Sequence, residues 1–160
     1  MPSTRALKLM ESSHRLLQKL TRGRAGWNVA GMPVVELTTI GRRSGERRAT
    51  MLTSPVKDGD ALVVVASRGG DDRHPAWFLN LRDDPNVEVV VEGRPSIAMI
   101  ARIANAEQRS RLWPLITAKY ANYAGYQRKT EREIPLVLLE PSPNARGGHG
   151  GGDGHERASG

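Results

Sequence analysis

Apolar and polar residues alternate with the two-residue period of a β-strand through much of the middle of the chain. In residues 96–103, for example, every second side chain is apolar. Asp-Gly within residues 57–60 separates two apolar runs, which is a strong hairpin signal, and Gly-Arg-Pro at 93–95 predicts a second hairpin. The segments predicted as strands are 34–39, 49–56, 61–67, 86–92, 96–103 and 134–140.

Helical periodicity is found in three other segments. Residues 3–24 form an amphipathic pattern with one apolar and one basic face, and residues 75–82 form a short helix that Asp-Pro closes. The third helix runs from Asn105 towards Tyr123, with a kink expected at Pro114. Asn105 and Gln108 have the spacing of a reciprocal N-terminal cap.

Hairpin connections predominate, and no repeated strand–helix–strand units occur. This order predicts an α+β, mainly β fold: an antiparallel sheet rolled into a small barrel with flanking helices. Three segments are expected along the chain. Residues 1–30 form an N-terminal amphipathic helix and linker, residues 31–143 form the barrel domain, and residues 144–160 form a disordered glycine-rich tail.

Composition narrows the classes of function. The 160-residue chain has no cysteine, which excludes disulfides, zinc–thiolate sites and thiol nucleophiles, and its four histidines suggest no protein metal site. The formal net charge of +7 implies an anionic partner, and an aromatic content of 4% argues against a nucleic-acid-stacking module. No apolar run is long enough to span a membrane and no signal peptide is evident, so a cytoplasmic location is expected. Peripheral membrane contact through residues 3–24 stays open as an alternative.

An arginine-rich turn is the first candidate site. Residues 41–48, Gly-Arg-Arg-Ser-Gly-Glu-Arg-Arg, join two predicted strands. The glycines let the backbone bend, and the arginines and Ser44 supply donors that suit a phosphate. A solvated basic hairpin explains the same residues equally well, so the turn alone does not decide.

Two further segments carry candidate chemistry. Residues 65–68 end a strand before a Gly-Gly loop, where exposed backbone suits a flat heterocycle, and the following helix carries Trp77 and Asn80. Trp77 is either core filler or a groove wall, and Asn80 could bridge loop and ligand. All the tyrosines of the chain lie at a spacing of three within residues 120–126. They form either a packed aromatic ridge or a substrate wall with hydroxyl donors.

These segments together resemble the deazaflavin-dependent nitroreductase family of split-barrel oxidoreductases. The matching pieces are TTIGRRSGERRATML, VVVASRGGDDRHPAWFLNLRDDPNVEV and YANYAGYQRKTEREIPLVLLE, in the family's order and spacing. The resemblance covers about Val34 to Pro141. It implies an FMN-binding-type split β-barrel that binds coenzyme F-420, whose phosphodiester and oligoglutamate tail would account for part of the positive charge.

The resemblance also implies roles for individual residues. The coenzyme phosphate and tail would be bound by Arg42, Arg43, Ser44, Gly45 and Arg48. The strand beside the deazaflavin would be Ala49, Thr50, Met51, Leu52, Thr53 and Ser54. The strand end against the ring would be Val65, Ala66, Ser67 and Arg68, and the groove would be closed by Ala76, Trp77, Phe78, Leu79 and Asn80. Tyr123 would lie on the cofactor side, Tyr120 and Tyr126 would shape the acceptor pocket, and Ser67 with the tyrosines would polarise the acceptor. Some family members have an aromatic residue in place of Ser54, which predicts a more open or polar acceptor pocket here.

The function implied is hydride transfer from reduced F-420 to a small acceptor: a quinone, a nitroaromatic or an activated alkene. Hydride transfer needs no acid–base pair of side chains, because the cofactor performs the chemistry. A non-catalytic F-420-binding protein and an FMN-binding barrel reductase are the alternatives, and a homodimer is left open.

Overall fold

The computed structural model describes residues 28–143, which form one antiparallel sheet system with three helices. The predicted helix over residues 3–24 and the predicted glycine-rich tail lie outside these residues. The strands are β1 (Asn28–Val29), β2 (Met32–Ile40), β3 (Arg47–Thr53), β4 (Val56–Asp58), β5 (Ala61–Val65), β6 (Asn86–Val91), β7 (Ile97–Ile103) and β8 (Leu136–Pro141). The α-helices are α2 (Ala76–Asp83), α3 (Ala106–Lys119) and α4 (Ala121–Arg128), and η1 (Arg68–Gly70) is a 3-10 turn.

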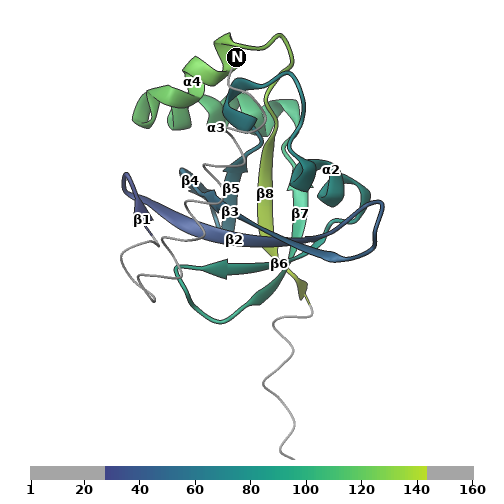
Figure 1. The fold of residues 1–160 in the computed structure, drawn as a ribbon. Coiled ribbons are helices and arrows are strands. Elements are labelled where there is room, and N and C mark those ends of the chain that lie inside the picture. The colour runs from purple at the N-terminus through teal and green to yellow at the C-terminus, as the bar shows by residue number, and fades with distance from the viewer. Residues whose placement is uncertain (1–27, 144–160) are drawn as a thin grey trace, which may run out of the picture.

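The sheet curves into a half-barrel. The strand order is β1-β2-β6-β7-β8-β5-β4, with β3 paired to β2, and every pairing is antiparallel. In Figure 1, β5, β8 and β7 run side by side while β2, β3 and β6 cross them, and α3 and α4 lie together near one end. The predicted antiparallel barrel with flanking helices is confirmed.

Two apolar clusters explain why β5 and β8 are apolar at successive positions. Leu62 and Val64 of β5 point into the barrel with residues of β2, β6, β7 and α2. Val63 and Val65 point to the opposite face, where they pack on α3 and α4. Strands covered on both faces carry no polar alternation, so their side-chain direction cannot be read from periodicity.

The local turn and capping predictions are confirmed. The β4–β5 hairpin closes through Gly59, which adopts a φ of +58°, with Asp58 opposite Ala61. At the start of α3, the N–H of Gln108 donates to Asn105 Oδ1 at 2.8 Å, and the N–H of Asn105 donates to Gln108 Oε1 at 3.0 Å.

Three boundaries differ from the sequence prediction. The strand expected over 49–56 is two strands, because the pairing with β2 ends after the Ser54 N–H, which donates to Pro33 O at 3.1 Å, and Pro55 has no N–H to donate. Helix α3 continues through Pro114, and the chain breaks instead at Tyr120, whose φ of −131° and ψ of 88° are not helical. Residues 28–29, within the predicted linker, form β1 and pair with β2.

Candidate functional site

The arginine-rich turn is a tight hairpin connection between β2 and β3. The N–H of Gly41 donates to Glu46 O and the N–H of Gly45 donates to Gly41 O, each at 2.8 Å. A Cβ on Gly41 would lie 2.6 Å from Ser44 Oγ and 3.3 Å from Glu46 O, so a larger residue here would require the Ser44 side chain to move. Within residues 28–143, the N–H groups of Arg43 and Ser44 make no hydrogen bond. The turn therefore presents two free backbone donors to solvent.

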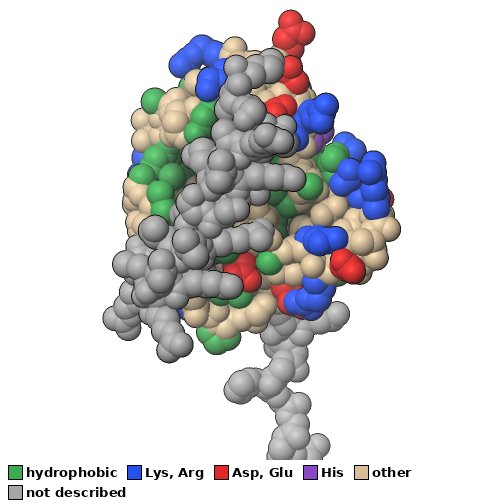
Figure 2. All heavy atoms as spheres, viewed as in Figure 1, with side chains coloured by type: hydrophobic (Ala, Val, Ile, Leu, Met, Phe, Trp, Pro, Cys, Tyr) green, Lys and Arg blue, Asp and Glu red, His purple; other side chains and the backbone are tan. Residues whose placement is uncertain are grey.

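The four arginines of the turn are not equivalent. Arg47 is bound by Glu88 of β6, and Arg48 is 3.1 Å from a carboxylate of the turn itself. Arg42 and Arg43 form no ion pair with any residue the structure describes. Figure 2 shows Lys and Arg side chains gathered on the edge of the molecule where the β2–β3 turn and α2 lie. Two uncompensated cations beside two free N–H groups suit an anionic ligand.

Asn80 of α2 holds this turn in place through hydrogen bonds. Its Oδ1 accepts the N–H of Arg42 at 3.2 Å, and its Nδ2 donates to Thr39 Oγ1 at 3.2 Å. Thr39 is fully buried and Asn80 is 5% exposed. Asn80 therefore joins helix and turn directly through its buried side chain.

The end of β5 offers a second set of donors. Ser67 is only 9% exposed, yet neither its hydroxyl nor its N–H makes a hydrogen bond with any residue of the described part of the chain. A nearly buried polar group without a partner indicates space for a ligand. Val65 and Ala66 before it are buried apolar residues. The strand end thus combines apolar backing with unused donors, which suits a flat heterocycle with carbonyl groups.

Sequence reasoning missed Arg132, which organises this strand end from the loop between α4 and β8. Its guanidinium donates to Ser67 O at 3.0 Å and to Asp71 O at 2.8 Å, and it also binds Ala66 O. Burial lowers the pKa of Arg132. The residue lies in the charged run Arg128–Glu133, whose composition is typical of a solvated loop, so no sequence pattern singles it out.

His74 completes the cluster. Its Nδ1 lies 3.2 Å from Arg132 Nη1, and its ring stacks on Phe78 with centroids 4.6 Å apart. Because arginine can only donate, Nδ1 accepts and the neutral ring carries its proton on Nε2. Burial, followed by the charges of Arg132 and Arg82, lowers the pKa of His74.

Helix α2 contributes mainly packing to the site. Trp77 and Phe78 are 8% and 3% exposed and belong to the barrel core, in edge-to-face contact at 6.4 Å. Leu79 is half-buried and Ala76 is exposed. Of the five residues expected to close the groove, Asn80 is the one whose side chain reaches the turn.

The strand expected beside the deazaflavin, β3, is only partly covered. Residues 50–53 are half-buried and Arg47 to Ala49 are exposed. Ser54 is different, because it is 3% exposed and its Oγ donates to Val63 O at 2.8 Å and to Val56 O at 3.2 Å. Its hydroxyl hydrogen is therefore engaged by backbone carbonyls at the β3–β4 corner.

The tyrosines form a packed ridge. Tyr123 meets Tyr120 and Tyr126 edge to face, with centroids 6.4 and 6.0 Å apart. Tyr123 is 6% exposed, and its Oη lies 3.3 Å from Thr53 Oγ1 of β3 and donates to Met32 Sδ at 3.7 Å. Burial raises the pKa of Tyr123, so its phenol stays protonated at neutral pH. The ridge connects α4 to the strand beside the candidate site.

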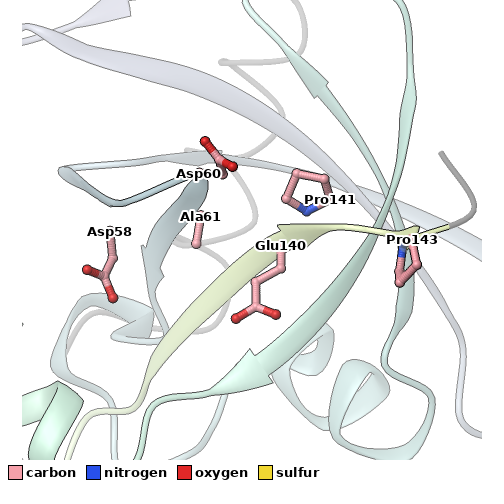
Figure 3. A pocket seen from close by; sticks show the side chains of 6 residues that line it. All are labelled: Asp58, Asp60, Ala61, Glu140, Pro141 and Pro143. Carbon is pink, nitrogen blue, oxygen red and sulfur yellow. The ribbon is translucent and has the colours of Figure 1, made fainter. Parts of the chain in front are cut away.

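A separate surface hollow of about 490 Å³ lies between the β4–β5 hairpin and the end of β8, lined by Asp58, Asp60, Ala61, Glu140, Pro141 and Pro143 (Figure 3). Two of its carboxylates are neutralised, since Arg111 holds Asp58 with two bonds of 2.9 Å and Arg102 is 2.7 Å from Glu140. Among residues 28–143, no three His, Asp or Glu side chains are grouped to hold a metal ion. No helix in that range is long and apolar enough to cross a membrane.

The comparisons with known proteins agree with this geometry. The sequence model of a family described as F420H(2)-dependent quinone reductase matches residues 11–141. An F420H(2)-dependent quinone reductase of Mycobacterium tuberculosis is 38% identical over 130 residues, which cover 79% of this chain and 86% of the relative.

Solved structures support the same assignment. One titled as an F420-H2 dependent reductase (FDR-A) is 37% identical, with a TM-score of 0.59 over 68% of this chain and 94% of that chain. Another, described as a domain-swapped dimer, is 34% identical, with a TM-score of 0.60 over 83% of this chain and 97% of that chain. The split-barrel fold expected from the sequence is thereby confirmed.

Proposed function

The chain belongs to the F420H(2)-dependent quinone reductase family and is an oxidoreductase that uses coenzyme F-420, and we propose that its acceptor is a small quinone. The observation that supports the proposal at the level of individual residues is the presence of two sets of unused hydrogen-bond donors. Among residues 28–143, Arg42 and Arg43 of the arginine turn form no ion pair, and at the end of β5 the hydroxyl and N–H of the nearly buried Ser67 have no hydrogen-bond partner.

The turn fits the coenzyme's phosphodiester. Arg42 and Arg43 supply uncompensated charge, and the N–H groups of Arg43 and Ser44 supply directed hydrogen bonds. Gly45, with a φ of +70°, gives the turn the shape that aims them. Arg48 already has a carboxylate neighbour, so we assign it a supporting role in holding the tail. Each charge-assisted bond is worth about 1.5–3 kcal/mol.

The end of β5 fits the ring system. The hydroxyl and N–H of Ser67 would bind the ring of the deazaflavin, and Ala66 and Val65 would supply apolar surface. Residues 49–53 of β3 line the groove, whereas Ser54 supports the β3–β4 corner through its engaged hydroxyl. When bound and reduced, the coenzyme supplies a hydride, and a proton completes the reduction of a quinone to a hydroquinone.

The acceptor lies against the tyrosine side of the groove. Tyr120 and Tyr126 shape its pocket, and Ser67 acts as a donor that polarises the acceptor oxygen. The protonated Tyr123 hydroxyl acts as a second donor when it turns away from Met32 Sδ, to which it donates in this structure.

Fluorescence titration of the purified protein with F-420 tests the binding site, with FMN as the competing ligand. Saturable binding of F-420 and none of FMN is expected, and the reverse preference would overturn the coenzyme assignment. Anaerobic mixing of protein, reduced F-420 and a menaquinone analogue then tests turnover. Coenzyme oxidation no faster than without protein would reject the quinone acceptor.

Nitroaromatics and enones are the competing acceptor classes. We expect the quinone to give the highest kcat/KM in a panel of all three, because the matching family and a relative that is 38% identical are described as quinone reductases. We also propose a homodimer, supported by the related structure described as a domain-swapped dimer. Light scattering at several protein concentrations measures this directly, and a monomer mass throughout would reject it.

A further inference from the structure

The loop after β5 has an unusual backbone. Ser67 is right-handed helical, with φ −79° and ψ −36°, and the next two residues are left-handed, Arg68 with φ +46° and Gly69 with φ +65°. Alternation of right- and left-handed residues turns successive N–H groups towards one point, which forms an anion-binding concavity called a nest. Arg68 is not glycine, so its positive φ is strained and must be held by the surroundings.

The donors of this nest are unused. The N–H groups of Gly70 and Asp71 bond back to the carbonyls of Ser67 and Arg68, at 2.9 and 3.2 Å. The three preceding N–H groups, of residues 67–69, bond to nothing in the described part of the chain. The concavity therefore keeps three N–H donors available for a ligand.

Arg132 lies behind the nest. It donates to Ala66 O through Nη1 and Nη2, at 3.3 and 3.2 Å, and to Ser67 O through Nη2 at 3.0 Å. In a trans peptide the C=O and the N–H point in opposite directions. These two carbonyls belong to the same peptide groups as the N–H groups of Ser67 and Arg68. The positive charge of Arg132 thus polarises the 66–67 and 67–68 peptide groups through their carbonyl oxygens. This makes the N–H groups of Ser67 and Arg68, on the opposite side of these peptides, stronger donors.

The guanidinium is held rigidly in this place. Its Nε donates to Asp71 O and its Nη1 also meets His74 Nδ1, so all five N–H groups have acceptors. The backbone of Arg132 is fixed as well, because its carbonyl accepts from Gln127 Nε2 at 2.7 Å and its N–H donates to Thr130 Oγ1 at 3.3 Å. A lysine has one charged nitrogen and cannot serve these spaced acceptors together.

We propose that Arg132 is a positioning residue that sets the Ser67–Gly69 nest to accept negative charge on the pyrimidine ring of the reduced deazaflavin. This inference rests on the proposed function and adds a residue to it. The reduced ring is more electron-rich than the oxidised ring and can lose a proton from its N1–C2 carbonyl unit. Donors strengthened by a fixed cation favour that reduced, anionic form over the oxidised form.

The test compares coenzyme affinity in both redox states for Arg132→Gln and for Arg128→Gln, a matched loss of charge at the end of α4, just before that loop. Arg132→Gln should weaken binding of reduced F-420 by about 10-fold, equivalent to about 1.4 kcal/mol, and that of oxidised F-420 several-fold less. An absorbance titration of the bound reduced coenzyme should show its ring pKa raised in Arg132→Gln. Arg128→Gln should change neither quantity.

A purely structural role would weaken both redox forms equally and leave the ring pKa unchanged, which would overturn the proposal. If wild-type protein bound no F-420 at all, the proposed function itself would fail, so the two failures are distinguishable. Ser67→Pro provides a test that leaves Arg132 in place. Proline fits the φ of −79° but removes the N–H, whereas Ser67→Ala keeps it. Ser67→Pro should lose more affinity for the reduced than for the oxidised coenzyme, relative to Ser67→Ala, and equal losses would contradict the nest.

Discussion

Asn80 Nδ2 donates a 3.2 Å hydrogen bond to Thr39 Oγ1, joining helix α2 to the end of β2 across 41 positions of sequence. Both residues are buried, and the same carboxamide accepts the N–H of Arg42 in the arginine turn. The turn that we assign to the coenzyme phosphate is therefore pre-positioned by a buried polar network. A network of this kind rigidifies a site when all its members have partners.

Replacement of Asn80 should uncouple the turn from the helix. Asn80→Ala leaves the Thr39 hydroxyl and the Arg42 N–H without their partner, which costs about 1–3 kcal/mol of unfolding free energy. F-420 affinity should also fall, because the turn must then be ordered on binding. Urea unfolding and fluorescence titration measure the two effects. Asn86→Ala removes an exposed asparagine that bonds to Asp84 and should change neither. An Asn80→Ala protein with unchanged stability and affinity would contradict the anchoring role.

Arg43 should matter more for the coenzyme than Arg47. Arg43→Ala removes a cation without a carboxylate partner and should weaken F-420 binding by about 10- to 100-fold, the equivalent of one charge-assisted bond. Arg47→Ala removes an arginine that Glu88 already binds and should have little effect. The two variants should bind a deazaflavin nucleoside, which lacks the phosphate and tail, with equal affinity. If Arg43→Ala weakened the nucleoside as much as F-420, the phosphate assignment would be wrong.

Gly70 should be sensitive to substitution. A Cβ there would lie 2.7 Å from Tyr126 O and 3.0 Å from Lys129 Cβ, and the φ of +85° disfavours any other residue. Gly70→Ala should cost about 2–4 kcal/mol, since strain and collision add. Gly59→Ala is the control, because its φ is +58° but nothing lies within 4 Å of its Cβ. It should cost about 1–2 kcal/mol, from the backbone strain alone. If chemical denaturation showed that Gly70→Ala and Gly59→Ala lose the same unfolding free energy, the close contact at Gly70 would relax with no energetic penalty.

The Tyr123 hydroxyl should have both a structural and a catalytic effect. Tyr123→Phe and Thr53→Val each remove one side of the 3.3 Å contact, and each should cost about 1 kcal/mol of stability, with a double variant that is less than additive. Only Tyr123→Phe should also lower kcat/KM for the quinone. Because burial raises the pKa of Tyr123 above its ordinary 10, the rate profile should show no ionisation of this group below about pH 10. If Tyr123→Phe and Thr53→Val had equal kcat/KM values, the Tyr123 hydroxyl would contribute to stability but not to catalysis.

His74 should make the protein less stable in acid. Its pKa is lowered in the folded state, by burial and then by Arg132 and Arg82, relative to an ordinary value of 6.5. The unfolded chain therefore binds the proton more tightly, and stability present above about pH 6.5 declines as the pH falls towards the folded-state pKa. Protonation also removes the acceptor of Arg132 Nη1. Unfolding free energies measured from about pH 8 to about pH 5 should fall more for wild type than for His74→Asn. If the difference in unfolding free energy between wild type and His74→Asn stayed constant over this pH range, His74 would not be the cause of the acid sensitivity.

Local physics explains what could be predicted from the sequence. The Asp58–Gly59 hairpin, the Asn105–Gln108 cap and the arginine turn each depend on residues within a few positions of one another. The antiparallel barrel follows from the hairpin connections between such segments. Tyr123 and Tyr126 keep their predicted helical spacing within α4, whereas Tyr120 lies at the break between α3 and α4 and still contacts Tyr123.

Only the tertiary structure decided which polar groups are free. Whether an arginine of the turn is available depends on Glu88, which lies 41 positions from Arg47. Ser54 faces carbonyls rather than a pocket because the β3–β4 corner folds onto β5. Arg132 reaches Ser67 across 65 positions, from a loop whose composition indicates solvent exposure. The sequence by itself determined the elements, since these follow from local propensity, and it indicated the coenzyme through the resemblance of its motifs to a known family. The folded chain alone determined the donors left for that ligand, because hydrogen-bond partners are chosen by proximity in space.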